Sequence, residues 1–151
     1  MTKQADMNPR QNNEPIVVDQ AFNASVDRVW SAITDSDQMK QWFFENIDSF
    51  RPEVGFETRF NVTSNGKDYL HIWKVTAVKP ERKISYAWRY GGYPGNSWVT
   101  WELTSGNDLT KLRLTHEGIE SFPQDNPDFS RDNCLEGWNF FIRTRLKEFL
   151  D

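Results

Sequence analysis

The sequence predicts an α+β fold in which a curved antiparallel sheet wraps around one long C-terminal helix. Residues 130–150 carry apolar side chains at helical spacing, and residues 56–117 alternate apolar and polar side chains between short turns. A helix with several aromatic rings along one face needs a broad apolar partner surface, and the strands provide it. We therefore expect the helix to lie against the sheet and any function to reside in the space between them.

The first strand and two short helices precede the rest of the sheet. Residues 16–22 alternate as a strand. Ser25 is placed as the N-cap of a short amphipathic helix, because apolar residues follow at positions 26, 29, 30 and 33. Asp35 caps a second short helix, which we expect over residues 36–44.

Five further strands are predicted to form an antiparallel meander. Asn65-Gly66, between the first two of them, is a strong hairpin signal because these residue types tolerate positive φ angles. A loop over residues 118–129, with two prolines, then leads into the last helix. The five strands are expected at residues 56–62, 69–78, 84–90, 97–104 and 109–117.

The last helix is predicted from its helical wheel, with about 100° per residue measured from Trp138. Gly137 lies inside this helix at a cost of about 1 kcal/mol relative to alanine, which predicts a close approach of another backbone or of the preceding loop. The apolar sector of the wheel comprises Cys134, Leu135, Trp138, Phe141, Ile142, Phe149 and, at its edge, Leu146.

Composition excludes several classes of protein. A net charge of −4 argues against a nucleic-acid binder, which needs a basic face to neutralise phosphates. No apolar run is long enough to span a membrane, and residues 1–14 lack the apolar core of a signal peptide and predict a disordered tail. We therefore expect a cytoplasmic protein with a single domain over residues 15–151. Its single cysteine, Cys134, cannot form an intrachain disulfide.

An ordered set of short motifs runs through nearly the whole chain from residue 16 to residue 150. It consists of Phe22-Asn23-Ala24-Ser25-Val26-Asp27-Arg28-Val29-Trp30, Trp42-Phe43, Gly55, Val75-Thr76-Ala77-Val78-Lys79-Pro80, Leu112-Arg113-Leu114-Thr115-His116-Glu117-Gly118 and Gly137-Trp138. In these motifs the sequence resembles the activator of Hsp90 ATPase homologue 1-like group of the START-like (SRPBCC, Bet v 1-like, polyketide cyclase) superfamily. The resemblance implies a helix-grip fold with a cavity between the long helix and the sheet. Folds of this kind carry lipids, hormones and polyketides, perform cyclisations, or bind proteins, so the resemblance implies no single activity.

The second half of the last helix departs from the group's pattern. The group usually has apolar residues about seven positions after Gly137-Trp138, whereas this sequence has Arg145 there and Leu146 one residue later. On the wheel Arg145 falls inside the apolar sector, where a buried, unpaired guanidinium would cost several kcal/mol. Its guanidinium must reach a carboxylate, carbonyls, solvent or an anionic ligand. It either fixes the carboxylate of a ligand in the cavity, or reaches solvent or a carboxylate such as that of Glu102 or Glu117. The second outcome is the more common for long cationic side chains.

Alternation along the sixth strand places His116 on the same face as Leu112 and Leu114, toward the core or cavity. A neutral imidazole there could bind a polar ligand group or act as a general base, although a structural histidine with satisfied hydrogen bonds is the simpler interpretation. The aromatic residues could line the cavity or fill the interior. The candidate ligand-binding residues are Trp42, Phe60, Tyr86, Trp88, Trp101, His116, Trp138, Phe141, Ile142 and Arg145.

The function predicted first is binding of a small hydrophobic or amphipathic ligand. One alternative is a cyclase- or hydratase-like enzyme that uses His116 or Tyr86 as acid or base. The other, implied only by the name of the group, is a chaperone-regulating, stress-response module that contacts a chaperone or a second copy of the chain. No catalytic or nucleotide-binding motif and no metal-ligand spacing is present, so we assign no catalytic residue, cofactor or metal.

Overall fold

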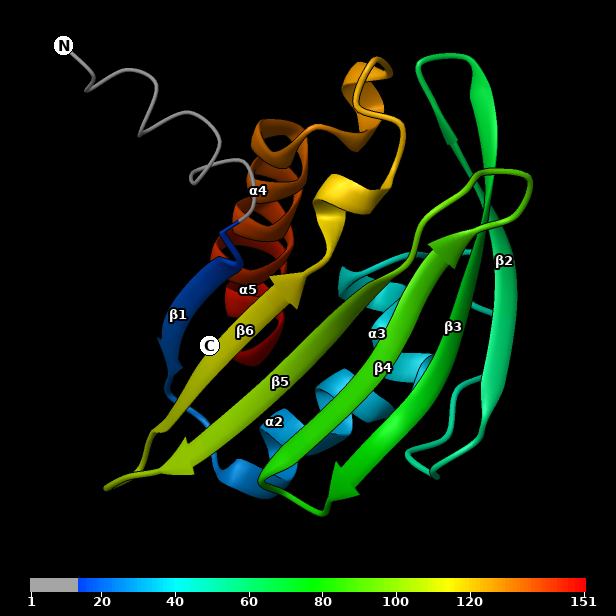
Figure 1. The fold of residues 1–151 in the computed structure, drawn as a ribbon. Coiled ribbons are helices and arrows are strands. Elements are labelled where there is room, and N and C mark those ends of the chain that lie inside the picture. Colours follow the sequence, from blue (N-terminus) through cyan, green and yellow to red (C-terminus); the bar gives the residue numbers. More distant parts are fainter. Residues whose placement is uncertain (1–13) are drawn as a thin grey trace, which may run out of the picture.

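The protein is described by a computed structural model that covers residues 14–151, so the predicted tail lies, except for Glu14, outside the described residues. Six strands form one antiparallel sheet, with the order β1-β6-β5-β4-β3-β2 (Figure 1). Each strand begins and ends within two residues of its predicted bounds. The strands are β1 (Ile16–Phe22), β2 (Glu57–Ser64), β3 (Lys67–Lys79), β4 (Lys83–Tyr90), β5 (Ser97–Ser105) and β6 (Thr110–Glu117).

The helices lie against one face of the sheet (Figure 1). Two short helices follow β1, and the C-terminal helix follows two single-turn 3₁₀ segments. The predicted α+β architecture, with a curved sheet and a long terminal helix, is therefore confirmed. The helical elements are α2 (Val26–Thr34), α3 (Ser36–Trp42), η1 (Ile119–Ser121), η2 (Pro127–Phe129), α4 (Arg131–Asn139), η3 (Phe140–Leu146) and α5 (Lys147–Leu150).

Of the two predicted N-caps, Asp35 makes a capping hydrogen bond and Ser25 does not. The side chain of Asp35 accepts a hydrogen bond from the Asp37 amide, and that of Ser130 accepts one from the Asn133 amide. Ser25 occupies the N-cap position of α2, but its side chain makes no capping bond. The second short helix ends at Trp42, two residues before its predicted end, because the backbone of the next residue leaves helical geometry.

The C-terminal helix contains a π-helical turn, which the sequence analysis did not foresee. Trp138, Ile142, Leu146 and Leu150 are all buried, although they are spaced four residues apart. In an uninterrupted α-helix each step of four residues rotates the side chain by about 40°, so the last of them would turn away from the sheet. The i→i+5 bonds of η3 hold more residues per turn and return these side chains to the buried face.

This turn corrects the predicted wheel. The wheel placed Arg145 in the apolar sector and Leu146 at its edge, whereas the structure buries Leu146 completely and leaves Arg145 partly exposed. The prediction assumed a constant rotation per residue. The apolar residues that arrive one position late are accommodated by the wider turn.

Aromatic rings pack the core densely beneath α3. The Trp42 indole N–H donates to the carbonyl of Ala32 at 2.8 Å, and its ring packs edge-on against Trp101 at 6.1 Å. Trp101 in turn donates to the hydroxyl of Tyr86 at 3.0 Å. All three rings are essentially inaccessible to solvent. This end of the space between helices and sheet is filled.

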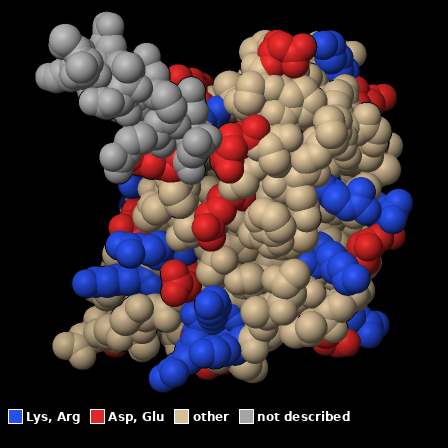
Figure 2. Space-filling model, in the orientation of Figure 1, with Lys and Arg blue, Asp and Glu red and all other residues tan. Residues whose placement is uncertain are grey.

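Two observations concern the surface of the described part of the chain. None of its helices combines the length and the apolar character needed to cross a membrane. On the face drawn in Figure 2, acidic and basic side chains are interspersed among uncharged ones, so neither sign of charge covers that face.

Candidate functional site

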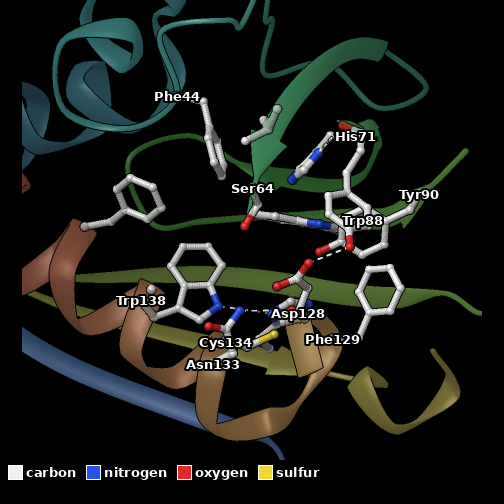
Figure 3. Close-up of a pocket in the computed structure, with 15 residues that line it drawn as sticks. Phe44, Ser64, His71, Trp88, Tyr90, Asp128, Phe129, Asn133, Cys134 and Trp138 are labelled. Atoms are coloured by element: carbon white, nitrogen blue, oxygen red, sulfur yellow. Dashed lines mark hydrogen bonds between the residues drawn. The ribbon is translucent and has the colours of Figure 1, made fainter. Parts of the chain in front are cut away.

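A pocket of about 240 Å³ lies between α4 and the sheet, toward the end where α4 begins (Figure 3). Its walls are mainly apolar. One wall comes from the C-terminal helix and the other from strands β2, β3, β4 and β6, with η2 at one side and the segment after α3 at the other. The lining residues are Phe44, Val62, Ser64, Tyr69, His71, Trp88, Tyr90, His116, Asp128, Phe129, Asn133, Cys134, Gly137, Trp138 and Phe141.

Gly137 contributes open space to the helix wall. A Cβ atom added to it would have no heavy atom within 4 Å outside the neighbouring helix backbone. The close approach of another backbone, predicted from a glycine inside a helix, is therefore wrong. The residue keeps side-chain atoms out of the pocket, at the cost of about 1 kcal/mol that glycine imposes on a helix.

His116 lies at the inner end of the pocket in a complete chain of hydrogen bonds. The Trp138 indole N–H can only donate, and it lies 3.0 Å from Nδ1 of His116, so Nδ1 is the acceptor. Nε2 therefore carries the proton and donates to the Ser97 hydroxyl at 2.9 Å. That hydroxyl donates to the carbonyl of Trp88 at 2.6 Å.

The environment of His116 keeps its imidazole neutral. Burial lowers its pKa from 6.5 to about 3, and both ring nitrogens already have partners. A general base needs a free lone pair near its substrate, and His116 has none. The structural interpretation of this histidine agrees with the observed contacts.

His71, on β3, has one ring nitrogen free. Its Nδ1 lies 3.1 Å from the carbonyl of Tyr69, an acceptor, so Nδ1 carries the proton and Nε2 is left as an acceptor. Nε2 has no hydrogen-bond partner among residues 14–151, and the ring projects into the pocket (Figure 3). Burial lowers the pKa of His71 from 6.5 to about 4, so this imidazole is also neutral near pH 7.

The strand face of His71 follows from a signal in the sequence. A two-residue Asn65-Gly66 turn fixes the hairpin register, and it pairs Phe60 with His71. Directly paired residues share a sheet face, so the inward direction predicted for Phe60 applies to His71 as well. Tyr90 pairs with His71 from the other side and also lines the pocket.

Asp128, on η2, ties the rim of the pocket together. One carboxylate oxygen accepts from the Tyr69 hydroxyl at 2.5 Å, and the other accepts from the side-chain amide of Asn65 at 2.7 Å. Asn126 also donates to the Tyr69 hydroxyl, at 3.0 Å. Burial, and next the hydrogen bond to Asp128, raise the pKa of Tyr69. These contacts join η2 to the β2–β3 hairpin.

Comparison with known families identifies the chain. The family model described as "Activator of Hsp90 ATPase homolog 1-like protein" matches residues 23–151. The chain belongs to the activator of Hsp90 ATPase homolog 1-like family. The resemblance predicted from the sequence motifs is thereby confirmed. A search of curated proteins gives no match.

Solved structures share this fold. Protein MLL2253 from Mesorhizobium loti is 28% identical, with a TM-score of 0.71 and coverage of 91% of this chain and 97% of its own. DynU16, a protein of the dynemicin biosynthetic locus, is 26% identical with a TM-score of 0.71, and the match covers 91% of this chain but 47% of DynU16. The Aha1 dimer from Colwellia psychrerythraea is 24% identical with a TM-score of 0.66, covering 90% and 95% of the two chains. The predicted helix-grip fold is confirmed.

In this member of the Activator of Hsp90 ATPase homolog 1-like family, four of the ten predicted ligand-binding residues line the pocket: Trp88, His116, Trp138 and Phe141. Five others are buried in the core rather than on the pocket wall: Trp42, Phe60, Tyr86, Trp101 and Ile142. Arg145 lies outside the pocket, and its guanidinium donates to the carbonyl of Gln41 at 2.7 Å, in the last turn of α3. The sequence did not reveal which rings border empty space, because this depends on how neighbouring rings pack.

Proposed function

We propose that this protein binds a small hydrophobic or amphipathic molecule in the pocket between α4 and the sheet. The observation that carries the proposal is a cavity of about 240 Å³ with mainly apolar walls, in a chain whose remaining core is densely packed. Small-molecule sites are typically concave, mostly apolar and provided with a few polar groups, and this pocket has those properties.

Gly137 supports the same proposal. Alanine at this position would stabilise the helix, and nothing in the surroundings would clash with it. Glycine at this position therefore lowers the stability of the helix and leaves more volume in the pocket. One structural relative, DynU16, is a protein of a biosynthetic locus, which is consistent with a ligand of small-molecule type.

The experiment that tests the proposal is a thermal-shift screen with small apolar ring compounds. A ligand that binds only the folded state stabilises it by about 2.7 kcal/mol when present at 100 times its dissociation constant. We expect several compounds to raise the melting temperature of the wild-type protein. The Gly137→Leu variant should fold but lose these shifts, because the leucine side chain enters the pocket.

Glu136→Leu is the matched control. It introduces the same side chain one residue earlier on the same helix, at an exposed position that does not line the pocket. Its thermal shifts should equal those of the wild type. The proposal fails if no compound binds the wild type, or if Gly137→Leu and Glu136→Leu respond alike.

The enzymatic alternative receives less support from the geometry. Both nitrogens of His116 are engaged, and the hydroxyl of Tyr86 is buried away from the pocket. Turnover of a bound compound that disappears in a folded His116→Gln variant would restore this alternative.

The chaperone-regulating alternative rests on the description of the family. Stimulation of the ATPase of Hsp90 by the purified protein tests it directly. The Aha1 protein from Colwellia psychrerythraea is a dimer, and light scattering on the same sample tests whether this chain also forms one.

A further inference from the structure

We infer that the ligand is a neutral, planar ring compound that carries a hydrogen-bond donor, and that Nε2 of His71 accepts this donor and selects the ligand. The inference rests on the proposed function and specifies the chemistry of the molecule bound. It makes His71 the specificity-determining residue of the pocket.

The first observation is the orientation of the His71 ring. Its Nδ1–H is committed to the carbonyl of Tyr69, so the ring presents a lone pair, and no proton, to the pocket. The side chain is 6% exposed. Nε2 is not among the fully buried polar atoms that lack a partner, so it borders the space of the pocket, where a ligand donor can take the place of water as its partner.

The second observation is that neighbouring rings hold the imidazole in place. Phe60 stacks on it with an angle of 25° between the ring planes, and Tyr90 packs edge-on at 4.9 Å. Phe44 packs against another side at 5.2 Å. A ring held on three sides cannot turn its acceptor away without disturbing the core, so the acceptor is preorganised for a ligand.

The third observation concerns charge. No lysine or arginine is among the described residues that line the pocket. Both histidines in the lining are neutral near pH 7 because burial lowers their pKa values, to about 4 for His71 and about 3 for His116. The charged group of the lining is the carboxylate of Asp128. A carboxylate or phosphate ligand would lose its hydration without gaining a cation, so the pocket favours a neutral molecule.

The fourth observation concerns size and shape. The volume of about 240 Å³ lies below the range of about 300–1,000 Å³ for pockets that hold drug-sized molecules, which indicates a single ring or two fused rings. Trp88, Trp138 and Phe141 border this space and offer aromatic surfaces against which a flat ring can pack.

Indole and benzofuran provide a matched pair of probes. They have nearly the same shape, but indole has an N–H donor where benzofuran has an oxygen atom. Their dissociation constants are measured by calorimetry for the wild type and for His71→Phe, which keeps an aromatic ring and removes the acceptor. His71→Leu serves as a second variant without an acceptor, and circular dichroism confirms that each variant is folded.

The net value of one hydrogen bond sets the expected effect. We expect the preference for indole over benzofuran to be about 3–10-fold greater in the wild type than in either variant. In addition, indole should move the ¹⁵N resonance of His71 Nε2 in the wild-type protein, in the direction of an accepted hydrogen bond, and benzofuran should not. This measurement remains decisive even when neither variant folds.

The outcomes separate the two proposals. If both probes bind in the pocket with the same relative preference in wild type and variants, or if indole leaves the Nε2 resonance unchanged, the role of His71 is refuted and the binding function stands. If neither these probes nor any compound of the thermal-shift screen binds the wild type, the binding function fails, and this inference fails with it.

Discussion

Acidification should destabilise the protein through its two buried histidines. Burial lowers the pKa of His71 to about 4 and that of His116 to about 3, whereas both titrate near 6.5 when exposed. Between these values the unfolded chain binds more protons than the folded protein. The contribution of the two neutral histidines to the free energy of unfolding is therefore fully present above about pH 6.5 and is lost as the pH falls below this value.

The magnitude follows from the difference in proton binding. A pH of about 5 lies roughly 1.5 units below the pKa of a histidine in the unfolded chain, while both histidines are still neutral in the folded protein. The resulting loss in the free energy of unfolding is about 2 kcal/mol per histidine. We expect a loss of about 4 kcal/mol between about pH 7.5 and about pH 5, a large part of the stability of a typical domain. Asp19, Asp27 and Asp151 contribute only at lower pH, because side-chain hydrogen bonds hold their pKa values below 3.8.

Urea denaturation followed by tryptophan fluorescence at several pH values measures this loss. In His71→Phe, which removes one of the two histidines, the loss should be about half as large. A free energy of unfolding that stays constant across the pH range would refute the reasoning. A variant that loses as much stability as the wild type would remove His71 from the explanation.

The remaining predictions concern the helix and the rim. Gly137→Ala should raise the free energy of unfolding by about 0.5–1 kcal/mol in urea denaturation, and a decrease would show that the site is not open. Trp138→Phe should lower it by about 1–3 kcal/mol because Nδ1 of His116 loses its donor, and a neutral result would contradict the hydrogen-bond chain. Asp128→Ala should accelerate amide hydrogen exchange in residues 118–130, because it removes the hydrogen bond that joins this segment to the Tyr69 hydroxyl on β3. Unchanged exchange in this segment would mean that the side chain of Asp128 does not hold it against the sheet.

The sequence predicted the strands well because their signals are local. Burial alternates with period two along β2, β4, β5 and β6, whereas in β3 the alternation is interrupted by three consecutive buried residues, His71 to Trp73. The turn at Asn65-Gly66 has positive φ angles of 53° and 78° at its two residues, as that dipeptide favours. The family motifs then supplied what local patterns cannot, namely the arrangement of the sheet around the last helix.

The pocket could be predicted only in part, since its walls depend on two features with no clear local signature. The four-residue spacing of Trp138, Ile142, Leu146 and Leu150 fits the π-helical turn. A helical wheel with a constant angle per residue cannot represent such a turn, so the wheel did not predict it. Gly137 suggested close packing, and only the positions of its neighbours show that it borders open space.

The partner of Arg145 was beyond sequence reasoning for a similar reason. Its guanidinium reaches a main-chain carbonyl, that of Gln41 in α3, and a carbonyl acceptor has no signature in the side chains. Carbonyls were among the predicted kinds of partner, but residue types single out only charged candidates such as Glu102 and Glu117, not one particular carbonyl.

A crystal structure of the protein soaked with indole tests the central claim most directly. We expect planar electron density in the pocket, with the indole nitrogen within hydrogen-bonding distance of His71 Nε2, and none in Gly137→Leu treated in the same way. A wild-type pocket that remains empty at saturating indole, or indole bound only on the outer face of the sheet, would contradict the account.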